Sequence, residues 1–158
     1  MPKQCRIGSD QRGFTLVETL VAMIIMGVTL GMVAGGSISW TRAREQSGTA
    51  QQLVSFLRQA QQRALTEATA YCVTFDSTTT YSMRKGGCAA AVTRGPAETD
   101  SPAVTLAASF TQADGTTGTQ IVFTPRGTAS PGTATVAREG RDPIVVQVEG
   151  LTARVSIV

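Results

Sequence analysis

The sequence predicts an α+β fold in which a long N-terminal helix packs on an antiparallel β-sheet head. Three observations predict it. Residues 20–38 are apolar, without a charged residue or a proline. Residues 47–70 then repeat apolar side chains at helical spacing, and from Tyr71 onward short strand-like segments alternate with breaks that contain Gly or Pro. With 158 residues, 42% hydrophobic and 16% charged, the chain is long and apolar enough to bury one core.

The apolar run begins at Phe14 and extends over residues 14–38, which exceeds the ~20 residues that a bilayer-spanning helix needs. We therefore expect residues 14–38 to form a transmembrane or filament-core helix, the front half of the long helix. Two simpler explanations fit the same composition. One is a secretory signal cleaved near Gly35, and the other is a plain single-pass anchor.

Glu18 is unusual for either simpler explanation, because a carboxylate at the apolar level of a bilayer costs roughly 2.5–3.5 kcal/mol. A cut after Gly13 would leave Phe14 with a free ammonium, and Glu18 lies four residues farther on, about one helical turn. The ammonium and the carboxylate could then pair, within one chain or between neighbouring chains. The position of Glu18 thus favours a role in docking one subunit onto another.

Residues 12–18 read RGFTLVE, and this stretch resembles the cleavage and methylation motif of type IV pilins and type II secretion pseudopilins. The resemblance implies a pilin-like fold and removal of a basic leader, residues 1–13, by a prepilin peptidase. The cut would fall between Gly13 and Phe14, and Phe14 would become N-methylated. Glu18 would neutralise the N-terminus of an adjacent subunit during filament assembly.

Residues 39–70 are expected to form the amphipathic back half of the helix, and residues 71–158 the β-rich globular head. One helical face of this segment carries Leu53, Leu57, Ala60 and Ala64, widened by Val54, Leu65 and Ala68. The helix could break near Gly48 or run through it. Residues 86–102, rich in Gly, Pro and small residues, are predicted to be a loop. The expected strands are AYCVTFD (70–76), TYSMRK (80–85), AVTLAASF (103–110), TQIVFTPRG (119–127), GTATVAR (132–138), PIVVQVE (143–149) and LTARVSIV (151–158).

Residues 57–64 and the segment VFTPRG, residues 122–127, resemble minor pseudopilins and minor pilins of the GspH/FimT type. Members of that family often close with a strand after a Gly-Arg pair. Gly150 matches this pattern, but Leu151 stands where the arginine is expected. The resemblance implies a structural subunit anchored once in the inner membrane with its head outside the cytoplasm, and then part of a filament. Its implied partners are other pilins or pseudopilins, the prepilin peptidase and the inner-membrane assembly platform.

The sequence contains three cysteines, of which Cys5 lies in the predicted leader. Cleavage would leave Cys72 and Cys88 as an even pair in an oxidising compartment, where disulfides persist. We expect them to be bonded, tying a loop to the hairpin built from the first two head strands. Two free thiols are the alternative.

DNA binding, as in a minor pilin that aids DNA uptake in natural transformation, is the alternative function, and it requires a basic patch. The net charge is +3, but residues 1–13 supply +2 of it, so the remaining chain is nearly neutral. Aromatic residues are sparse, at 5%. The candidate phosphate contacts are Arg84, Lys85 and Arg94, or Arg126, Arg138, Arg141 and Arg154.

Enzymatic chemistry has no support in the sequence. The chain has no histidine, which removes the commonest general base and metal ligand near neutral pH. No nucleophile elbow, phosphate-cradling glycine loop or dense calcium-binding loop is present in the sequence. We therefore predict no catalytic residue, no metal site and no cofactor.

Overall fold

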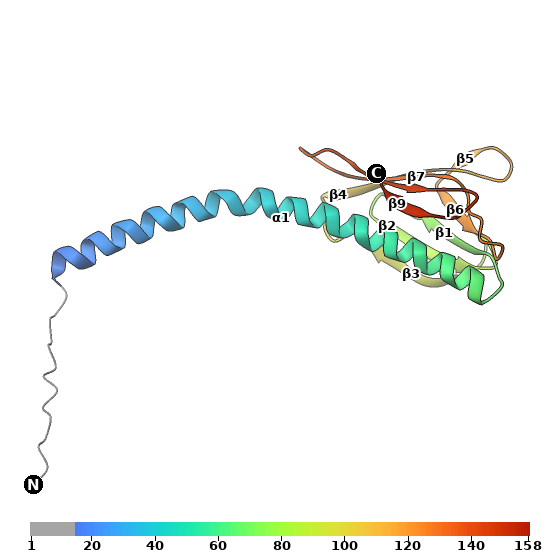
Figure 1. The fold of residues 1–158 in the computed structure, drawn as a ribbon, viewed down its shortest axis with the longest axis horizontal. Helices are drawn as coiled ribbons and strands as arrows, with labels where there is room; N and C mark the ends of the chain where they lie inside the picture. Colours follow the sequence, from blue (N-terminus) through green and yellow to red (C-terminus); the bar gives the residue numbers. More distant parts are fainter. Residues whose placement is uncertain (1–14) are drawn as a thin grey trace, which may run out of the picture. The chain divides into compact units, whose positions relative to one another are not determined.

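The computed structural model describes the backbone of residues 15–158 and the side chains of residues 15–31 and 43–158 (Figure 1). The predicted leader, residues 1–13, and the cleavage position at Gly13 and Phe14 lie outside the described residues. The chain divides after Trp40 into an N-terminal unit and a head, which are described separately.

The N-terminal unit contains the start of a single helix, α1, which spans Leu16–Thr66. Apolar side chains cover most of the surface of its described front part, residues 16–31, which is the pattern of a helix that is buried by other proteins or by lipid. No helix among the described residues is long and apolar enough to cross a membrane. The side chains of residues 32–38, part of the predicted 14–38 span, are not among those described. The exposed apolar residues are Leu16, Val17, Leu20, Val21, Met23, Ile24, Ile25, Met26, Val28 and Leu30.

In the head, α1 runs through Gly48 without a break and buries one face against strands. The predicted stripe is confirmed at Val54, Leu53, Leu57, Ala60 and Ala64, all of which are buried.

The prediction was wrong at the end of the stripe. Leu65 is 48% exposed, and Ala68 is exposed beyond the helix, which ends at Thr66 rather than at residue 70. Ala68 adopts a φ of 48°, a left-handed conformation that stops an α-helix. The last predicted turn is therefore replaced by the turn that leads into the first strand.

The first sheet has four antiparallel strands in the order β3-β2-β1-β6. Hairpin β1–β2 forms around residues 77–79 as predicted, with Val73 opposite Met83 and Cys72 opposite Arg84. Strand β6, far along the sequence, pairs with the other edge of β1 and places Ile121 opposite Val73. The strands are β1 (Tyr71–Phe75), β2 (Thr80–Lys85), β3 (Val92–Glu98) and β6 (Gln120–Phe123).

The prediction that residues 86–102 form a loop was wrong, because strand β3 spans Val92–Glu98 within this segment. It lies at the edge of the sheet, and all but one of its residues are exposed, so the sequence shows no alternation of apolar and polar side chains. It also contains Gly95 and Pro96, which strands accept mainly at edges and irregularities. Two register shifts in the β2–β3 pairing accommodate them.

The other four predicted strands form a second antiparallel sheet together with β5, a two-residue strand that the sequence did not predict, in the order β5-β4-β7-β8-β9. The sequence predicted an antiparallel sheet laid on the helix, and the structure divides the head strands between two. Strand β7 pairs over most of its length with β4 on one side and with β8 on the other, whereas β9 occupies an outer edge. The strands are β4 (Val104–Thr111), β5 (Thr117–Gly118), β7 (Gly132–Arg138), β8 (Ile144–Val148) and β9 (Val155–Ile157).

An aromatic cluster joins the helix and both sheets. Phe56 of α1 meets Tyr81 of β2 edge to face, with ring centroids 4.8 Å apart. Phe75 of β1 lies 6.1 Å from Tyr81 and stacks 6.0 Å from Phe110 of β4. Such aromatic pairs stabilise beyond the area that they bury. The cluster thereby fixes α1 and the two sheets as one core.

Candidate functional site

Glu18 lies in the first turn of α1, where the local sequence caps the helix. Its backbone N–H donates to the Thr15 carbonyl at 3.0 Å and to the Thr15 hydroxyl oxygen at 3.3 Å. A threonine at this position satisfies one of the unpaired N–H groups at a helix start. The Glu18 carboxylate is exposed and forms no ion pair within the described part of the chain. It is therefore a free acidic group on an otherwise apolar surface.

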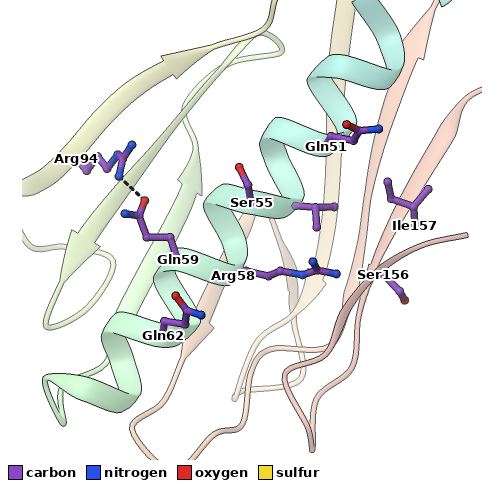
Figure 2. Close-up of a pocket in the computed structure, with 9 residues that line it drawn as sticks. Gln51, Ser55, Arg58, Gln59, Gln62, Arg94, Ser156 and Ile157 are labelled. Atoms are coloured by element: carbon purple, nitrogen blue, oxygen red, sulfur yellow. Dashed lines mark hydrogen bonds between the residues drawn. The ribbon is translucent and has the colours of Figure 1, made fainter. Parts of the chain in front are cut away.

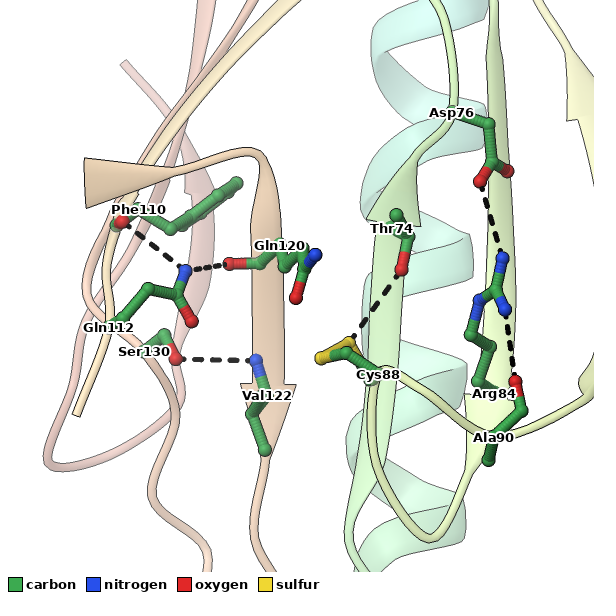
Figure 3. Close-up of a disulfide and its surroundings, with 11 residues drawn as sticks. Thr74, Asp76, Arg84, Cys88, Ala90, Phe110, Gln112, Gln120, Val122 and Ser130 are labelled. Carbon is green, nitrogen blue, oxygen red and sulfur yellow. Dashed lines mark hydrogen bonds and ion pairs between the residues drawn. A yellow bond between two sulfur atoms is a disulfide. The ribbon is translucent and has the colours of Figure 1, made fainter. Parts of the chain in front are cut away.

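The structure brings Cys72 and Cys88 together in a disulfide with a Cα–Cα distance of 5.1 Å (Figure 3). Cys72 is on β1, and Cys88 is in the segment between β2 and β3. Arg84 holds the same segment, because its guanidinium donates to the Ala90 carbonyl at 3.0 Å and lies 3.6 Å from the Asp76 carboxylate. The disulfide therefore ties the start of the exposed β3 region to the centre of the first sheet.

The four arginines of the second basic set lie in two separate places. Arg138 and Arg141 belong to the β7–β8 hairpin, and Arg138 forms an ion pair with Glu45 of α1. Arg126 lies in the turn after β6, and the neighbouring Gly127 packs near Leu65 of α1. Residues 45 and 65 are about 30 Å apart along a helix at 1.5 Å per residue.

Arg154 belongs with the Arg126 end, because Ala129, just beyond the Arg126 turn, donates its N–H to the carbonyl of Gly150 at 2.8 Å in the segment that precedes Arg154. Arg126 and Arg154 are exposed, as is Arg141. The geometry therefore separates these four arginines into two small groups.

In the first basic set, Arg84 and Lys85 also form ion pairs, with Asp76 and Glu67 respectively. Lys85 Nζ donates to a Glu67 carboxylate oxygen at 2.5 Å, and the Tyr71 hydroxyl donates to the same oxygen at 2.7 Å. These two hydrogen bonds, that from Lys85 above all, lower the pKa of Glu67. Burial, and then the bond to Glu67, raise the pKa of Tyr71, while the pKa of Lys85 rises because of Glu67. This group joins the end of α1 to the first sheet.

Gln46 anchors α1 to the second sheet, and sequence reasoning missed it. Its side chain is 2% exposed, and Nε2 donates to the Val136 carbonyl at 3.1 Å and to the Asp142 carbonyl at 2.9 Å. The signal was present, because Gln46 precedes Leu53 by seven residues and so extends the buried stripe by two turns. A buried amide on that face needs hydrogen-bond partners, and the β7–β8 hairpin supplies them.

A groove of about 770 Å³ follows the outer face of α1 in the head (Figure 2). Arg94 of β3 lies on one side, and Ser156 and Ile157 of β9 lie on the other. We call it the outer-face groove. Its floor is a row of helix residues at near-helical spacing: Gln51, Val54, Ser55, Arg58, Gln59 and Gln62.

A smaller hollow of about 230 Å³ adjoins this groove and shares Ser55, Gln59 and Arg94 with it. Tyr81 lines the hollow, and its buried hydroxyl has no hydrogen-bond partner among the described residues. Burial, and secondarily the Asp100 carboxylate, raise the pKa of Tyr81 to about 12. The hydroxyl is therefore a neutral hydrogen-bond donor at physiological pH.

The described residues contain no group of three or more Cys, Asp or Glu side chains that could hold a metal ion. The chemistry they offer is recognition through an apolar helix, an exposed Glu18 and a basic groove.

Two sequence families match the chain. The prokaryotic N-terminal methylation motif matches residues 8–34, and the type II transport protein GspH matches residues 49–152. Among curated proteins, none matches this chain by sequence.

Solved structures share the fold. The type IV minor pilin FimU of Pseudomonas aeruginosa superposes with a TM-score of 0.57 at 17% identity, over 75% of this chain and 92% of FimU. The minor pseudopilin EpsH from the type II secretion system of Vibrio cholerae superposes with a TM-score of 0.55 at 14% identity, over 72% of this chain and 93% of EpsH. At such low identity, the similarity establishes a common pilin fold of a helix packed on antiparallel sheets.

Proposed function

Because this chain belongs to the GspH family of type II transport proteins and carries the N-terminal methylation motif, we propose that it is a minor filament subunit that assembles through Glu18. In this proposal, a prepilin peptidase cuts between Gly13 and Phe14 and methylates Phe14. The subunit starts as a single-pass protein of the inner membrane with its head outside the cytoplasm. Its partners are other pseudopilins or pilins and the assembly platform of the inner membrane.

The observation that carries the proposal is the isolated carboxylate of Glu18 on an apolar helix. Such a charge is costly when the surrounding surface is covered by lipid or by neighbouring helices, unless a cation pairs with it. The new N-terminal ammonium of a neighbouring subunit is the cation that the motif provides. In a low-dielectric helix bundle, this pair would be strong and would set the axial register between subunits.

The disulfide and the apolar surface of the N-terminal unit agree with the proposed location and assembly. A Cys72–Cys88 bond is suited to an oxidising compartment outside the cytoplasm. The apolar residues of the N-terminal unit, such as Leu20 and Ile24, offer the surface through which helices would pack together in a filament.

The test follows processing and assembly separately in the native cell. Mass spectrometry of the wild-type chain is expected to find a mature N-terminus at N-methylated Phe14. Gly13→Leu is expected to remain uncut. Glu18→Gln is expected to be cut normally, yet to be missing from sheared filaments and from cross-links to other subunits.

Glu139→Gln is the matched control, because Glu139 is an exposed carboxylate that follows β7 in the head. It is expected to process and assemble as the wild type does. An intact Met1, or a cut near Gly35, would contradict the processing step. Normal assembly of Glu18→Gln would contradict the role of Glu18.

A further inference from the structure

The outer-face groove carries positive charge and no negative charge. Of the nine described residues that line it, two are arginines, Arg58 and Arg94, and none is acidic. Neither arginine forms an ion pair within the described part of the chain. The groove is therefore complementary to a carboxylate.

Neutral groups position both guanidinium groups, yet each guanidinium has further N–H donors that these contacts do not use. Arg94 donates to the Gln59 side-chain oxygen, and its guanidinium carbon lies 5.8 Å from the centre of the Phe56 ring. Arg58 donates to the Val155 carbonyl at 3.1 Å. A guanidinium has five N–H donors in a fixed planar arrangement. Each arginine is thus positioned by neutral partners and can still bind a carboxylate.

The adjoining hollow supplies a further donor. The Tyr81 side chain is fully buried, and leaving a buried hydroxyl without a partner is unfavourable. Arg94 lines the same hollow, and, besides burial, the Asp100 carboxylate lies near enough to raise the pKa of this hydroxyl. An acidic side chain that reached into the hollow would find Arg94, Tyr81 and the polar side chains of Ser55 and Gln59 around it.

Strand β9 forms an open edge of the second sheet beside the groove, because it pairs only with β8 among the described strands. The Arg154 carbonyl accepts a hydrogen bond from the Glu149 N–H, and the Val158 N–H donates to the Val145 carbonyl. Both residues therefore direct their backbone hydrogen bonds toward β8. Since successive residues of an antiparallel strand alternate in the direction of their hydrogen bonds, Val155 and Ile157 direct theirs outward. Arg58 occupies the Val155 carbonyl, which agrees with this alternation. The backbone groups of Ile157 can therefore pair with an added extended segment.

We propose that the outer-face groove binds an extended acidic segment of a partner protein, which pairs with the edge of β9 and places carboxylates against Arg58 and Arg94. The open strand edge favours a peptide over a nucleic acid, since a phosphate backbone offers no strand to pair with β9 and gains affinity from many more cationic contacts. This docking site is separate from assembly through Glu18. It depends only on residues of the head.

The test uses the full chain in detergent and two fluorescent octapeptides, one alternating Glu with Val and the other alternating Gln with Val. Fluorescence anisotropy is expected to show binding of the glutamate peptide that weakens with salt, and much weaker binding of the glutamine peptide. Arg58→Gln and Arg94→Gln are each expected to weaken binding by about tenfold, as expected for the loss of one charge-assisted contact. Arg63→Gln removes the same charge from α1 outside the groove lining and is expected to bind as the wild type does.

Thermal melts of the three variants are measured in parallel, so that a loss of binding by a folded variant is distinguished from unfolding. Equal binding of the two peptides, or equal weakening in all three variants, would overturn the proposal. Competition by oligothymidine at the same arginines would assign the groove to nucleic acid instead. Self-association that Arg94→Gln abolishes, without peptide binding, would assign it to a second copy of the chain.

Discussion

Replacing Gln46 by leucine tests how α1 is fixed to the second sheet. The Gln46 amide is buried and bonds two carbonyls, those of Val136 in β7 and of Asp142 in the β7–β8 connection. Leucine fills a similar volume but donates no hydrogen bond. The substitution therefore removes both contacts and leaves two carbonyl oxygens without that donor.

The expected loss follows from these contacts. Each hydrogen bond contributes about 1 kcal/mol net, and a carbonyl left buried without a partner adds to the cost. The free energy of unfolding of the head should fall by about 2–3 kcal/mol. With a urea dependence of roughly 2 kcal/mol per molar, the midpoint of unfolding should fall by about 1 M.

The assay is urea unfolding of the full chain in detergent, followed by the near-ultraviolet circular dichroism of the buried tyrosines Tyr71 and Tyr81. Gln51→Leu, at an exposed position of the same helix, controls for the general effect of adding leucine. A midpoint for Gln46→Leu within about 0.2 M of that control would refute the reasoning, because the loss of one buried and one partly buried hydrogen bond should have a larger effect.

Three further predictions concern the head. Replacing Cys72 and Cys88 with serine opens a loop of sequence separation 16 and should lower the free energy of unfolding by about 3 kcal/mol; a non-reduced wild type that melts no higher than the double variant would contradict this. Gly132→Ala would place a Cβ against the Ser109 carbonyl oxygen of β4 and should force β4 and β7 apart, so soluble, protease-resistant variant protein would argue against that packing. Because Lys85 lowers the pKa of Glu67 in the folded state, the contact stabilises the head above the ordinary carboxyl pKa of 4.5 and loses this effect as the pH falls through the lowered value. Glu67→Gln should accordingly flatten the acid limb of stability measured against pH, and an unchanged acid limb would show that the contact adds nothing.

Local patterns in the sequence were enough to predict much of the fold. Leu53, Leu57, Ala60 and Ala64 recur at helical spacing, and burial of that face needs only some apolar surface opposite it. Hairpin β1–β2 was predictable because its strands are adjacent in sequence and a short polar turn at residues 77–79 joins them.

The arrangement of strands was not predictable in the same way. The pairing of β6 with β1 joins segments separated by about 45 residues, and no local pattern distinguishes it from other pairings. Strand β3 is exposed on nearly every residue, so it lacks the alternation by which a strand is recognised. The ion pair between Glu45 and Arg138 was not predictable for the same reason, since these residues are 93 positions apart in the sequence.

The sequence by itself determined the features that depend on neighbouring residues. These are the motif around Glu18, the apolar front of the helix and its amphipathic continuation, whose spacing follows directly from 3.6 residues per turn. Only the tertiary structure decided which arginines are paired and which are free. It paired Arg138 with Glu45, and it placed Arg58 on the floor and Arg94 on one side of the outer-face groove. The physical reason is that the interactions of a charged side chain depend on its distance from other groups in space, and folding brings these groups together from distant parts of the chain.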